Sequence, residues 1–352
     1  MRILFVNPRP YLPQLFGGVH QTTFELEREL ARMGHETAVM CGIVSYDAVW
    51  LRSRIVGHLR GRAFPAQRYR KSRVYRGYEP LRGFEEVVSD FHPDVVVTAG
   101  GTMESFELAA LAARSGVPGA FYFHEISTLR ALKTPELLEG LALVANSTYT
   151  AGIVAELLGR PSTVIPPLIS RAAYQTVSSR RFVTMVNPRR VKGGQTAYEL
   201  ARACPDIPFV FVEAWTRDDP FVAELRGAAQ QLPNVKWLRP TPRMRKLYGA
   251  TRILLAPSEC EESWGRVASE AHLSGIPVLA SSIAALPESV GPGGILVDPG
   301  APLARWVEGL RSMWDDATLY TQLSAQALEF SARPQLQPLR QAERFLAVLR
   351  EQ

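Results

Sequence analysis

Short apolar runs alternate along this chain with stretches that repeat apolar residues at helical spacing. Alternation of this kind predicts an α/β fold built on parallel sheets with crossover helices. In the first half, helices are predicted over Phe24–Arg32 and Glu104–Arg114. Strands are predicted over Ile3–Asn7, Thr37–Cys41, Val95–Ala99, Ala120–Phe123, Leu141–Ala145 and Thr163–Ile165.

A second series of strands begins near Arg181, after Pro166-Pro167 and a polar stretch from Ser170. Its predicted strands are Phe182–Val186, Phe209–Val212, Val235–Leu238, Arg252–Ala256, Pro277–Ala280 and Ile295–Val297. Two such series without an internal copy of either predict two Rossmann-like domains, over residues 1–168 and 177–332, that face each other across a cleft. The tail after Pro334 has a helical pattern.

The length of 352 residues suits two domains, and 46% hydrophobic with 21% charged residues is typical of a soluble globular protein. The sequence contains no run of 18 apolar residues, which is the length that a membrane-spanning helix needs. The first residues lack the long apolar core of a secretion signal. Three dispersed cysteines without a Cys-x-x-Cys pair argue against a disulfide framework or a zinc site. A cytoplasmic location is expected.

The formal net charge of +6 is concentrated between Trp50 and Gly83. Glu79 is the one acidic residue of that stretch, against ten basic residues: Arg52, Arg54, Arg60, Arg62, Arg68, Arg70, Lys71, Arg73, Arg76 and Arg82. Aromatic and aliphatic residues are interleaved with them. The plain interpretation is a solvated surface loop. Contact of residues 52–82 with an anionic membrane or an anionic acceptor is the alternative, ahead of nucleic acid.

The segment Pro257–Val278 carries the most informative chemistry, because apolar runs on both sides make it the loop and helix of one βαβ unit. We expect its helix to begin at Ser263, where free N–H groups and a partial positive charge attract phosphate. Glu262 precedes this helix, and Glu270 lies two turns inside it, roughly 10 Å further. The spacing suits a nucleotide-sugar, with Glu262 on sugar hydroxyls and Glu270 on ribose. Two ordinary surface glutamates are the plain alternative.

The same segment resembles the retaining glycosyltransferases of family 4, which have the GT-B fold. Members carry Pro-Ser, Glu, a Phe-Gly-like pair, Glu-Ala, Gly-x-Pro-Val and Pro-Glu in this order. The corresponding residues here are Pro257-Ser258, Glu262, Trp264-Gly265, Glu270-Ala271, Gly275-Ile276-Pro277-Val278 and Pro287-Glu288. In GT-B enzymes the last helix crosses back to the N-terminal domain, which we expect of residues 335–352.

The resemblance also implies a diphosphate site. Lys192-Gly193 resembles the family's Lys-Gly, whose lysine binds the leaving diphosphate. Members usually place an arginine five or six residues earlier, where this chain has Val186 and Asn187, so Arg189 or Arg190 could substitute. A basic loop that caps the next helix is the alternative. The helix start Ser263–Arg266 would contact the donor phosphates.

Two further positions belong to the predicted N-terminal domain. Gly17-Gly18 is not a Gly-x-Gly-x-x-Gly fingerprint, but it resembles the glycine-rich loop that approaches the donor phosphates in the family. His124, at the end of a predicted strand, resembles the histidine that contacts the transferred sugar, and Glu125 could orient it or hold the acceptor. A bare turn and a structural histidine are the alternatives.

The sequence thus favours a retaining glycosyltransferase that uses a nucleoside diphosphate-sugar, UDP before GDP, and a glycan, lipid-linked or natural-product acceptor. No Asp-x-Asp motif is present, since Asp218-Asp219 and Asp315-Asp316 are adjacent pairs, so neither a metal nor another cofactor is expected. The resemblance implies a front-face mechanism without a protein nucleophile. A sugar-nucleotide epimerase of the GT-B fold and a non-catalytic nucleotide-sugar-binding module stay open as alternatives.

Overall fold

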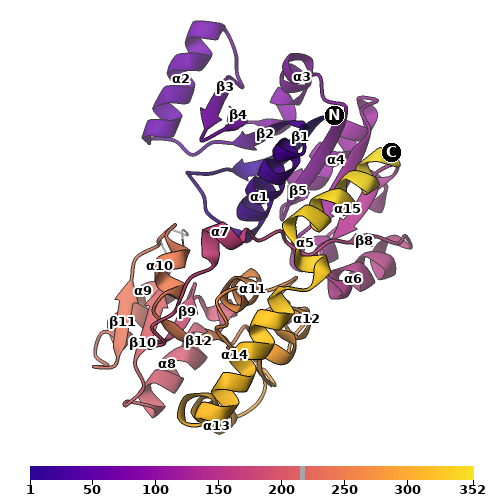
Figure 1. The fold of residues 1–352 in the computed structure, drawn as a ribbon. Coiled ribbons are helices and arrows are strands. Elements are labelled where there is room, and N and C mark those ends of the chain that lie inside the picture. Colours follow the sequence, from indigo (N-terminus) through magenta and orange to yellow (C-terminus); the bar gives the residue numbers. More distant parts are fainter. Residues whose placement is uncertain (215–218) are drawn as a thin grey trace. The chain divides into compact units, whose positions relative to one another are not determined.

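A computed structural model describes residues 1–214 and 219–352. The chain divides into two compact units, which are Met1–Leu168 together with Gln337–Gln352, and Ile169–Leu336. Each unit contains one sheet that is parallel throughout or nearly so, with helices on both faces (Figure 1). The α/β fold class predicted from the sequence is therefore confirmed.

The N-terminal unit is built on a sheet of order β3-β4-β2-β1-β5-β6-β7-β8, in which only β3 is antiparallel to its neighbour. The strands are β1 (Arg2–Pro10), β2 (Glu36–Gly42), β3 (Ala66–Tyr69), β4 (Ser72–Arg76), β5 (Val95–Gly100), β6 (Gly119–Phe123), β7 (Ala142–Ala145) and β8 (Thr163–Val164). The helices are α1 (Gly18–Arg32), α2 (Ala48–Arg60), α3 (Pro80–Phe91), α4 (Met103–Arg114), α5 (Ile126–Arg130), η1 (Pro135–Leu138), α6 (Thr148–Leu158) and α15 (Pro338–Arg350).

Both faces of this sheet are apolar because its strands are covered on both sides. Successive residues of β1 point to opposite faces, as the pleat requires. Ile3 and Phe5 belong to a core with α1 and α15, whereas Leu4 and Val6 belong to a core with α3 and α4. Because both faces of these strands are buried, nearly every residue along them is apolar, and these continuous apolar runs predicted the strands.

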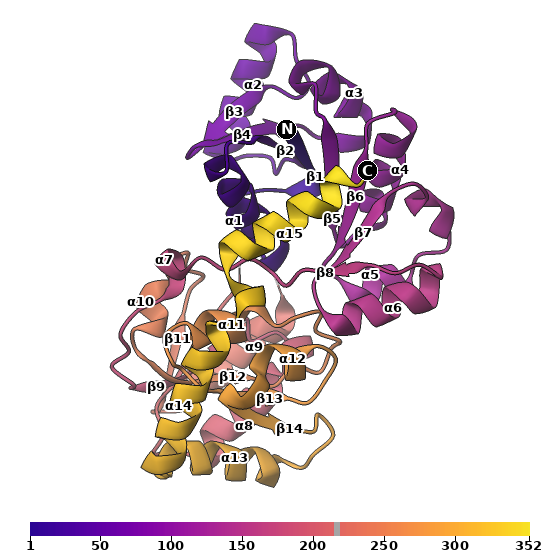
Figure 2. The same cartoon turned by 45° about the vertical axis from the view of Figure 1, so that its right-hand side comes forward.

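The last helix, α15, is part of the N-terminal unit. The Phe345 ring packs against those of Phe5 and Tyr122, with centroids 6.5 and 5.7 Å apart. Gln341 Nε2 donates to the carbonyl oxygen of Pro166 at 2.8 Å. Figures 1 and 2 both show α15 beside α1 on one face of the sheet. The helix thus completes the core of a unit whose other helices and strands all lie within Met1–Leu168.

The basic stretch of residues 52–82 is not a loop, as its plain interpretation assumed. It forms most of α2, the β3–β4 hairpin and the start of α3. Arg76 is fully buried, and its guanidinium donates to the carbonyl oxygens of Tyr11 and Leu12 in the loop after β1. A buried guanidinium needs such acceptors, so this arginine is structural.

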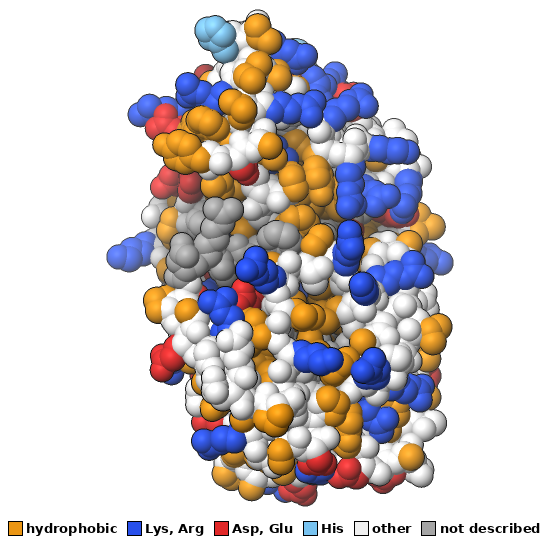
Figure 3. Space-filling model, turned by 90° about the vertical axis from the view of Figure 1, so that its left-hand side faces the viewer, with side chains coloured by type: hydrophobic (Ala, Val, Ile, Leu, Met, Phe, Trp, Pro, Cys, Tyr) orange, Lys and Arg blue, Asp and Glu red, His pale blue; other side chains and the backbone are white. Residues whose placement is uncertain are grey.

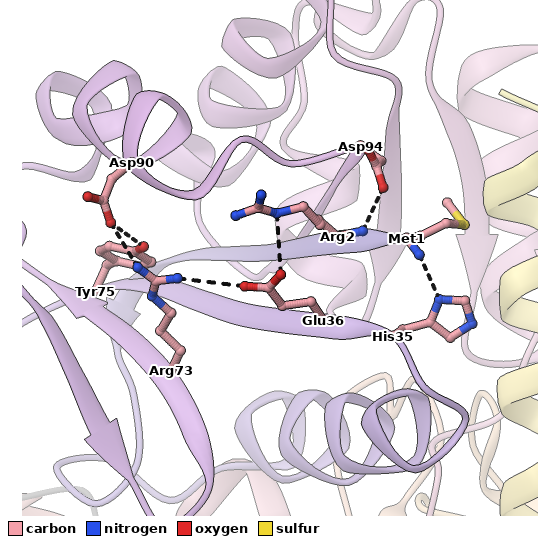
Figure 4. Close-up of polar contacts among 8 residues, drawn as sticks. All are labelled: Met1, Arg2, His35, Glu36, Arg73, Tyr75, Asp90 and Asp94. Atoms are coloured by element: carbon pink, nitrogen blue, oxygen red, sulfur yellow. Dashed lines mark hydrogen bonds and ion pairs between the residues drawn. The ribbon is translucent and has the colours of Figure 1, made fainter.

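At the amino ends of β1, β2 and β4, charged side chains join neighbouring strands (Figure 4). Glu36 contacts Arg2 at 3.5 Å and Arg73 at 3.7 Å, and Arg73 also contacts Asp90 at 3.1 Å. Tyr75 donates its hydroxyl to Asp90 at 2.6 Å. The ion pairs are partly exposed, so each contributes little to stability.

The C-terminal unit has the sheet order β11-β10-β9-β12-β13-β14, and its described strands are all parallel. They are β9 (Phe182–Val186), β10 (Phe209–Val212), β11 (Val235–Leu238), β12 (Thr251–Ala256), β13 (Val278–Ser281) and β14 (Gly294–Val297). The helices are α7 (Arg171–Tyr174), η2 (Arg190–Lys192), α8 (Gly194–Ala203), α9 (Pro220–Ala229), α10 (Met244–Tyr248), α11 (Arg266–His272), α12 (Leu286–Val290), η3 (Gly291–Gly293), α13 (Leu303–Asp315), α14 (Ala317–Ser331) and η4 (Pro334–Leu336).

In this unit too, alternate strand residues serve opposite cores. Leu255 packs with α8, α13 and α14, while Leu254 and Ala256 pack with α11 and α12. Figure 2 shows these helices around the strands of the sheet. The six predicted strands of this unit all exist, with ends that differ from the prediction by at most one residue.

Glu27 is a buried carboxylate on the inner face of α1. It accepts hydrogen bonds from Ser72 at 2.5 Å and Thr37 at 3.1 Å, and so ties the helix to β4 and β2. Burial raises the pKa of Glu27 to about 7, although both hydroxyls and the Arg28 charge lower it. The folded protein therefore binds a proton here that the unfolded chain releases above its ordinary pKa of 4.5.

Replacement of Glu27 by Gln should stabilise the protein at pH 8 and leave it nearly unchanged at pH 4.5. Because the folded-state pKa is raised, the stability linked to this proton is complete below pH 4.5 and is lost as the pH rises to about 7. At 1.36 kcal/mol per pKa unit, the difference approaches about 3 kcal/mol. Urea unfolding of both proteins across this range measures it, and a difference independent of pH would contradict the assignment.

Candidate donor site

Two loops at the carboxyl ends of β9 and β12 meet in the C-terminal unit. The carbonyl oxygen of Val191 accepts the backbone N–H groups of Glu259 at 3.0 Å and Cys260 at 3.2 Å. Gly193, at φ +75°, lies so close to Pro257 that a Cβ would stand 1.8 Å from its carbonyl oxygen. Carboxyl ends of adjacent parallel strands are where α/β folds place ligands.

This junction brings Lys192 and Glu262 together. Lys192 Nζ donates to Glu262 Oε1 at 2.6 Å, and Ser258 Oγ donates to the same oxygen at 2.7 Å. Burial disfavours the ammonium form, but the Glu262 carboxylate and the Cys260 thiol outweigh it and raise the pKa of Lys192. The site therefore holds a lysine that is charged at neutral pH, with a carboxylate fixed beside it.

Glu270 is buried in a second polar cluster. Its Oε1 accepts from Arg266 Nε at 2.8 Å, and its Oε2 accepts from the Tyr248 hydroxyl at 2.8 Å. Arg266 Nη2 also donates to the Tyr174 hydroxyl at 3.1 Å. Burial, followed by the Glu270 charge, raises the pKa of Tyr248 well above its usual range. The tyrosine hydroxyl therefore stays a hydrogen-bond donor to the carboxylate.

The helix of this segment begins later than the sequence predicted. It starts at Arg266, since Gly265 at φ +80° has a left-handed backbone that no α-helix continues. Ser263 and Trp264 thus lie in the preceding loop. The Trp264 ring is buried, and its Nε1 donates to Ser269 Oγ at 3.0 Å. Glu270 is one turn inside the helix, not two, because the helical part is shorter than expected.

Arg189 and Arg190 both turn toward the start of α9. Arg189 Nε donates to Asp219 Oδ2 at 2.9 Å, and Asp219 caps that helix by accepting from two backbone N–H groups. The Arg190 guanidinium lies 4.4 Å from the centre of the Phe221 ring. Asp218 lies outside the described residues. Of the three predicted cations of this loop, Lys192 is the one that contacts Glu262.

In the N-terminal unit, His124 directly follows β6, and its ring lies 4.0 Å from that of Tyr122. Glu125 caps the start of α5, and its carboxylate lies 3.9 Å from Arg9, near the end of β1. Arg9 also donates to the carbonyl oxygen of Gly101, after β5, at 3.0 Å. The carboxyl ends of three adjacent strands thus contribute to one polar group.

Gly17 and Gly18 stand at the start of α1. Gly17 is its N-terminal cap in an extended conformation, and a Cβ there would lie 3.1 Å from His20 Nδ1. No atom of the described residues would lie within 4 Å of a Cβ at Gly18. Neither glycine has a positive φ, so the backbone conformation at these two positions does not require glycine. Burial, with the nearby Arg9 charge, lowers the pKa of His20 to about 4.

Two family models match the chain, and together they cover more than half of it. The first, "Glycosyltransferase Family 4", matches residues 16–172, and the second, "Glycosyl transferases group 1", matches residues 197–316. The chain belongs to the family 4, group 1 glycosyltransferases.

Curated relatives of this glycosyltransferase resemble it over one part only. A D-inositol 3-phosphate glycosyltransferase of Corynebacterium diphtheriae is 36% identical over 96 residues, or 27% of this chain and 22% of the relative. The enzyme of the same name from Corynebacterium kroppenstedtii is 37% identical over 105 residues, 29% of this chain and 23% of the relative. The matches therefore span less than a quarter of each relative's length.

Solved structures resemble the glycosyltransferase over its whole length. Anabaena HepE in complex with UDP-glucose has a TM-score of 0.79 at 17% identity and covers 100% of both chains. WaaG, a glycosyltransferase involved in lipopolysaccharide biosynthesis, has a TM-score of 0.69 at 14% identity over 97% of this chain and 98% of its own. These neighbours share the GT-B fold, which confirms the predicted fold.

Several residues of the sites in this glycosyltransferase escaped the sequence analysis. They are Tyr248 beside Glu270, Tyr174 beside Arg266, Cys260 beside Lys192, and Arg9 beside Glu125. Cys260 and Ser258 stand within the Pro-Ser segment, which could have indicated them. Tyr248 precedes β12 without any spacing that distinguishes it from a core tyrosine.

Within the described residues, no group of three or more His, Cys, Asp or Glu side chains is placed to hold a metal ion. Across residues 1–214 and 219–352, no helix combines the length and the apolar character needed to cross a bilayer.

Replacement of Gly193 by Ala should separate the two loops and destabilise the C-terminal unit. An L-residue at φ +75° is strained, and its Cβ would collide with the backbone of Pro257. We expect a loss of about 2 kcal/mol or more in urea unfolding. Gly227 in α9 is a matched control, since a Cβ there meets no described atom within 4 Å, and Gly227→Ala should not destabilise. Equal stability of the two variants would contradict the packing described.

Proposed function

We propose that this chain is a retaining glycosyltransferase that moves a sugar from a nucleoside diphosphate-sugar, UDP in preference to GDP, to an acceptor. Family membership supports the class of reaction. The observation that carries the proposal is the pairing of Lys192 with Glu262, 2.6 Å apart, at the carboxyl ends of β9 and β12. A fixed cation there meets the charge that develops on a departing diphosphate.

Lys192 is proposed to bind the diphosphate while it keeps its contact with Glu262. An ammonium group has three N–H donors, so one can stay on the carboxylate and the others can reach phosphate oxygens. Glu262 Oε1 is held by Lys192 and Ser258, whereas none of the described residues donates to Oε2. Oε2 is therefore the proposed acceptor for sugar hydroxyls.

Glu270 is proposed to bind the ribose. Arg266 Nε and the Tyr248 hydroxyl each donate to one of its oxygens, and these two contacts fix the orientation of a carboxylate that can accept from a ribose hydroxyl. The remaining predicted donor contacts stay part of the proposal. They are Ser263, Trp264 and Gly265 near the phosphates, and Arg189 or Arg190 as the second cation.

The N-terminal unit is proposed to hold the acceptor, with His124 near the reacting carbon and Gly17-Gly18 near the donor phosphates. The acceptor class stays open between a glycan, a lipid-linked molecule and a natural product. We also propose a cytoplasmic location with residues 52–82 against an anionic membrane surface. No protein nucleophile is assigned, since the leaving phosphate would assist deprotonation of the acceptor.

The purified protein should bind UDP in calorimetry and slowly hydrolyse a matching UDP-sugar. Lys192→Ala should weaken UDP binding by about tenfold or more, because a charge-assisted hydrogen bond contributes roughly 1.5–3 kcal/mol. Lys246→Ala is the matched control, since Lys246 is an exposed lysine of the same unit, and it should leave the affinity unchanged. Failure of the wild-type protein to bind any nucleoside diphosphate would refute the proposed function.

Product analysis separates transfer from the two alternatives. A transferase needs an acceptor for rapid turnover and keeps the anomeric configuration, which NMR of the product reports. An epimerase releases product without an acceptor, and a binding module releases none. Treatment with EDTA should leave the rate unchanged, because cationic side chains are proposed to replace a metal ion. A rate that EDTA abolishes and magnesium restores would contradict this part.

Glu270→Gln should weaken UDP binding and leave pyrophosphate binding unchanged. The amide keeps the shape of the side chain but loses the charge that strengthens the ribose hydrogen bond, which we expect to cost about tenfold in affinity. Lys192→Ala should weaken both ligands, because its target is the diphosphate that they share. If Glu270→Gln affects UDP and pyrophosphate equally, Glu270 does not bind the ribose.

A further inference from the structure

The helix α2 packs against its unit with small residues and exposes its large aliphatic ones. Ser53 and Gly57 are buried, and a Cβ on Gly57 would lie 2.8 Å from the carbonyl oxygen of Arg62. In contrast, Leu51, Ile55 and Leu59 are 54%, 52% and 77% exposed. Amphipathic surface helices normally do the reverse. The outward face of α2 therefore carries an apolar row that no described residue covers.

The row is continuous along the helix, since residues four apart lie on one face. Aromatic residues stand near its first turn. Tyr46 is 91% exposed and lies 5.4 Å from the Trp50 ring, and Trp50 Nε1 donates to the hydroxyl of exposed Tyr78. Tryptophan and tyrosine favour the boundary between water and lipid, because each has an apolar body and a polar end.

Not all of the ten basic residues of this stretch are free to meet a partner. Arg76 is buried, Arg62 and Arg73 contact Asp90, and Arg82 contacts Glu79. The other six are exposed: Arg52, Arg54, Arg60, Arg68, Arg70 and Lys71. Figure 3 shows Lys and Arg side chains beside hydrophobic ones over the upper part of the molecule, where α2 lies. Positive charge therefore borders the apolar row.

The helix is already formed without a partner. Asp47 caps its first turn by accepting from Trp50 N at 2.7 Å, and Gln14 Nε2 holds both oxygens of Asp47. Ser53 Oγ donates to the carbonyl oxygen of Arg76 at 3.3 Å. Docking through α2 thus requires no folding of the helix, and its ordering entropy is not lost on binding.

We propose that α2 lies in the interfacial plane of an anionic membrane, with Leu51, Ile55 and Leu59 in the acyl boundary. The bordering arginines can extend their heads to lipid phosphates while their stems stay apolar. A second copy of the chain fits this face poorly, because a two-fold contact would oppose basic residues to basic residues. Nucleic acid would match the charge but not the aliphatic row.

A consequence concerns the substrate, and this part rests on the proposed function. A transferase held at the bilayer by its N-terminal unit has ready access to an acceptor anchored in the same membrane. We therefore assign a lipid-linked acceptor to this enzyme. Vesicle binding itself does not depend on any transferase activity.

The full chain should sediment with vesicles of phosphatidylcholine and about 30% phosphatidylglycerol and not with phosphatidylcholine alone. Combined replacement of Leu51, Ile55 and Leu59 by Ser should lower the partition coefficient by about tenfold or more, because the inserted apolar area is lost. Combined Arg52→Gln and Arg60→Gln should also weaken binding, and high salt should abolish the difference from the wild type.

Matched controls come from exposed residues elsewhere in the same unit. Leu157→Ser with Leu339→Ser removes two leucines of 38% and 50% exposure from α6 and α15. Arg340→Gln with Arg344→Gln removes the same charge from α15. Both controls should bind vesicles as the wild type does. Calorimetry with UDP should give equal affinities for all variants, so that loss of vesicle binding cannot be ascribed to misfolding.

Three results would overturn the inference. They are vesicle binding that survives the triple serine replacement, binding to phosphatidylglycerol that depends on the arginines alone, and a wild-type dimer that the triple replacement dissociates without any vesicle binding. Vesicle binding by a protein that binds no nucleoside diphosphate would refute the proposed function and leave this surface standing. UDP-sugar hydrolysis by a protein that does not bind vesicles would support the proposed function and refute the membrane-binding surface.

Discussion

The proposed donor site depends on how the backbones of two loops are joined. One carbonyl oxygen, that of Val191, accepts two N–H groups of the neighbouring loop, and Gly193 allows the loops to touch at Pro257. These contacts are made by the backbone, so the positions of the two loops do not depend on the charged side chains. Lys192 and Glu262 then meet because they flank it on either side. Preorganisation of this kind keeps charged groups in position without further reorganisation.

Charge balance explains the second cluster. Glu270 is buried, and an isolated carboxylate at such a depth would be costly. Arg266, one turn earlier on the same helix, supplies the opposite charge, while Tyr248 supplies a neutral donor. Separate partners therefore stabilise the two glutamates: a lysine from another loop for Glu262, and an arginine of its own helix for Glu270. The side chains of the first pair are 30% and 16% exposed, whereas those of Arg266 and Glu270 are 10% and 5% exposed.

Much of this architecture was readable from the sequence, for a physical reason. Parallel strands buried on both faces have near-continuous apolar runs, and all the predicted strands exist. The short strands β3 and β4 were missed because arginines interrupt their apolar residues. The start of α11 was misplaced by three residues, since the left-handed conformation of Gly265 cannot be distinguished from an ordinary helical entry. Tyr248, which donates to Glu270, and Tyr174, which accepts from Arg266, come from distant α10 and α7, and no local spacing reveals them.

The position of α15 has a consequence for how the chain matures. Phe5 and Tyr122 are synthesised early, but the ring of Phe345 that covers them comes more than two hundred residues later. On the ribosome, the second unit is therefore complete before the first can bury its apolar face. During that interval the nascent N-terminal segment exposes a surface that invites aggregation or chaperone binding. The order of synthesis and the order of completion are thus reversed in this protein.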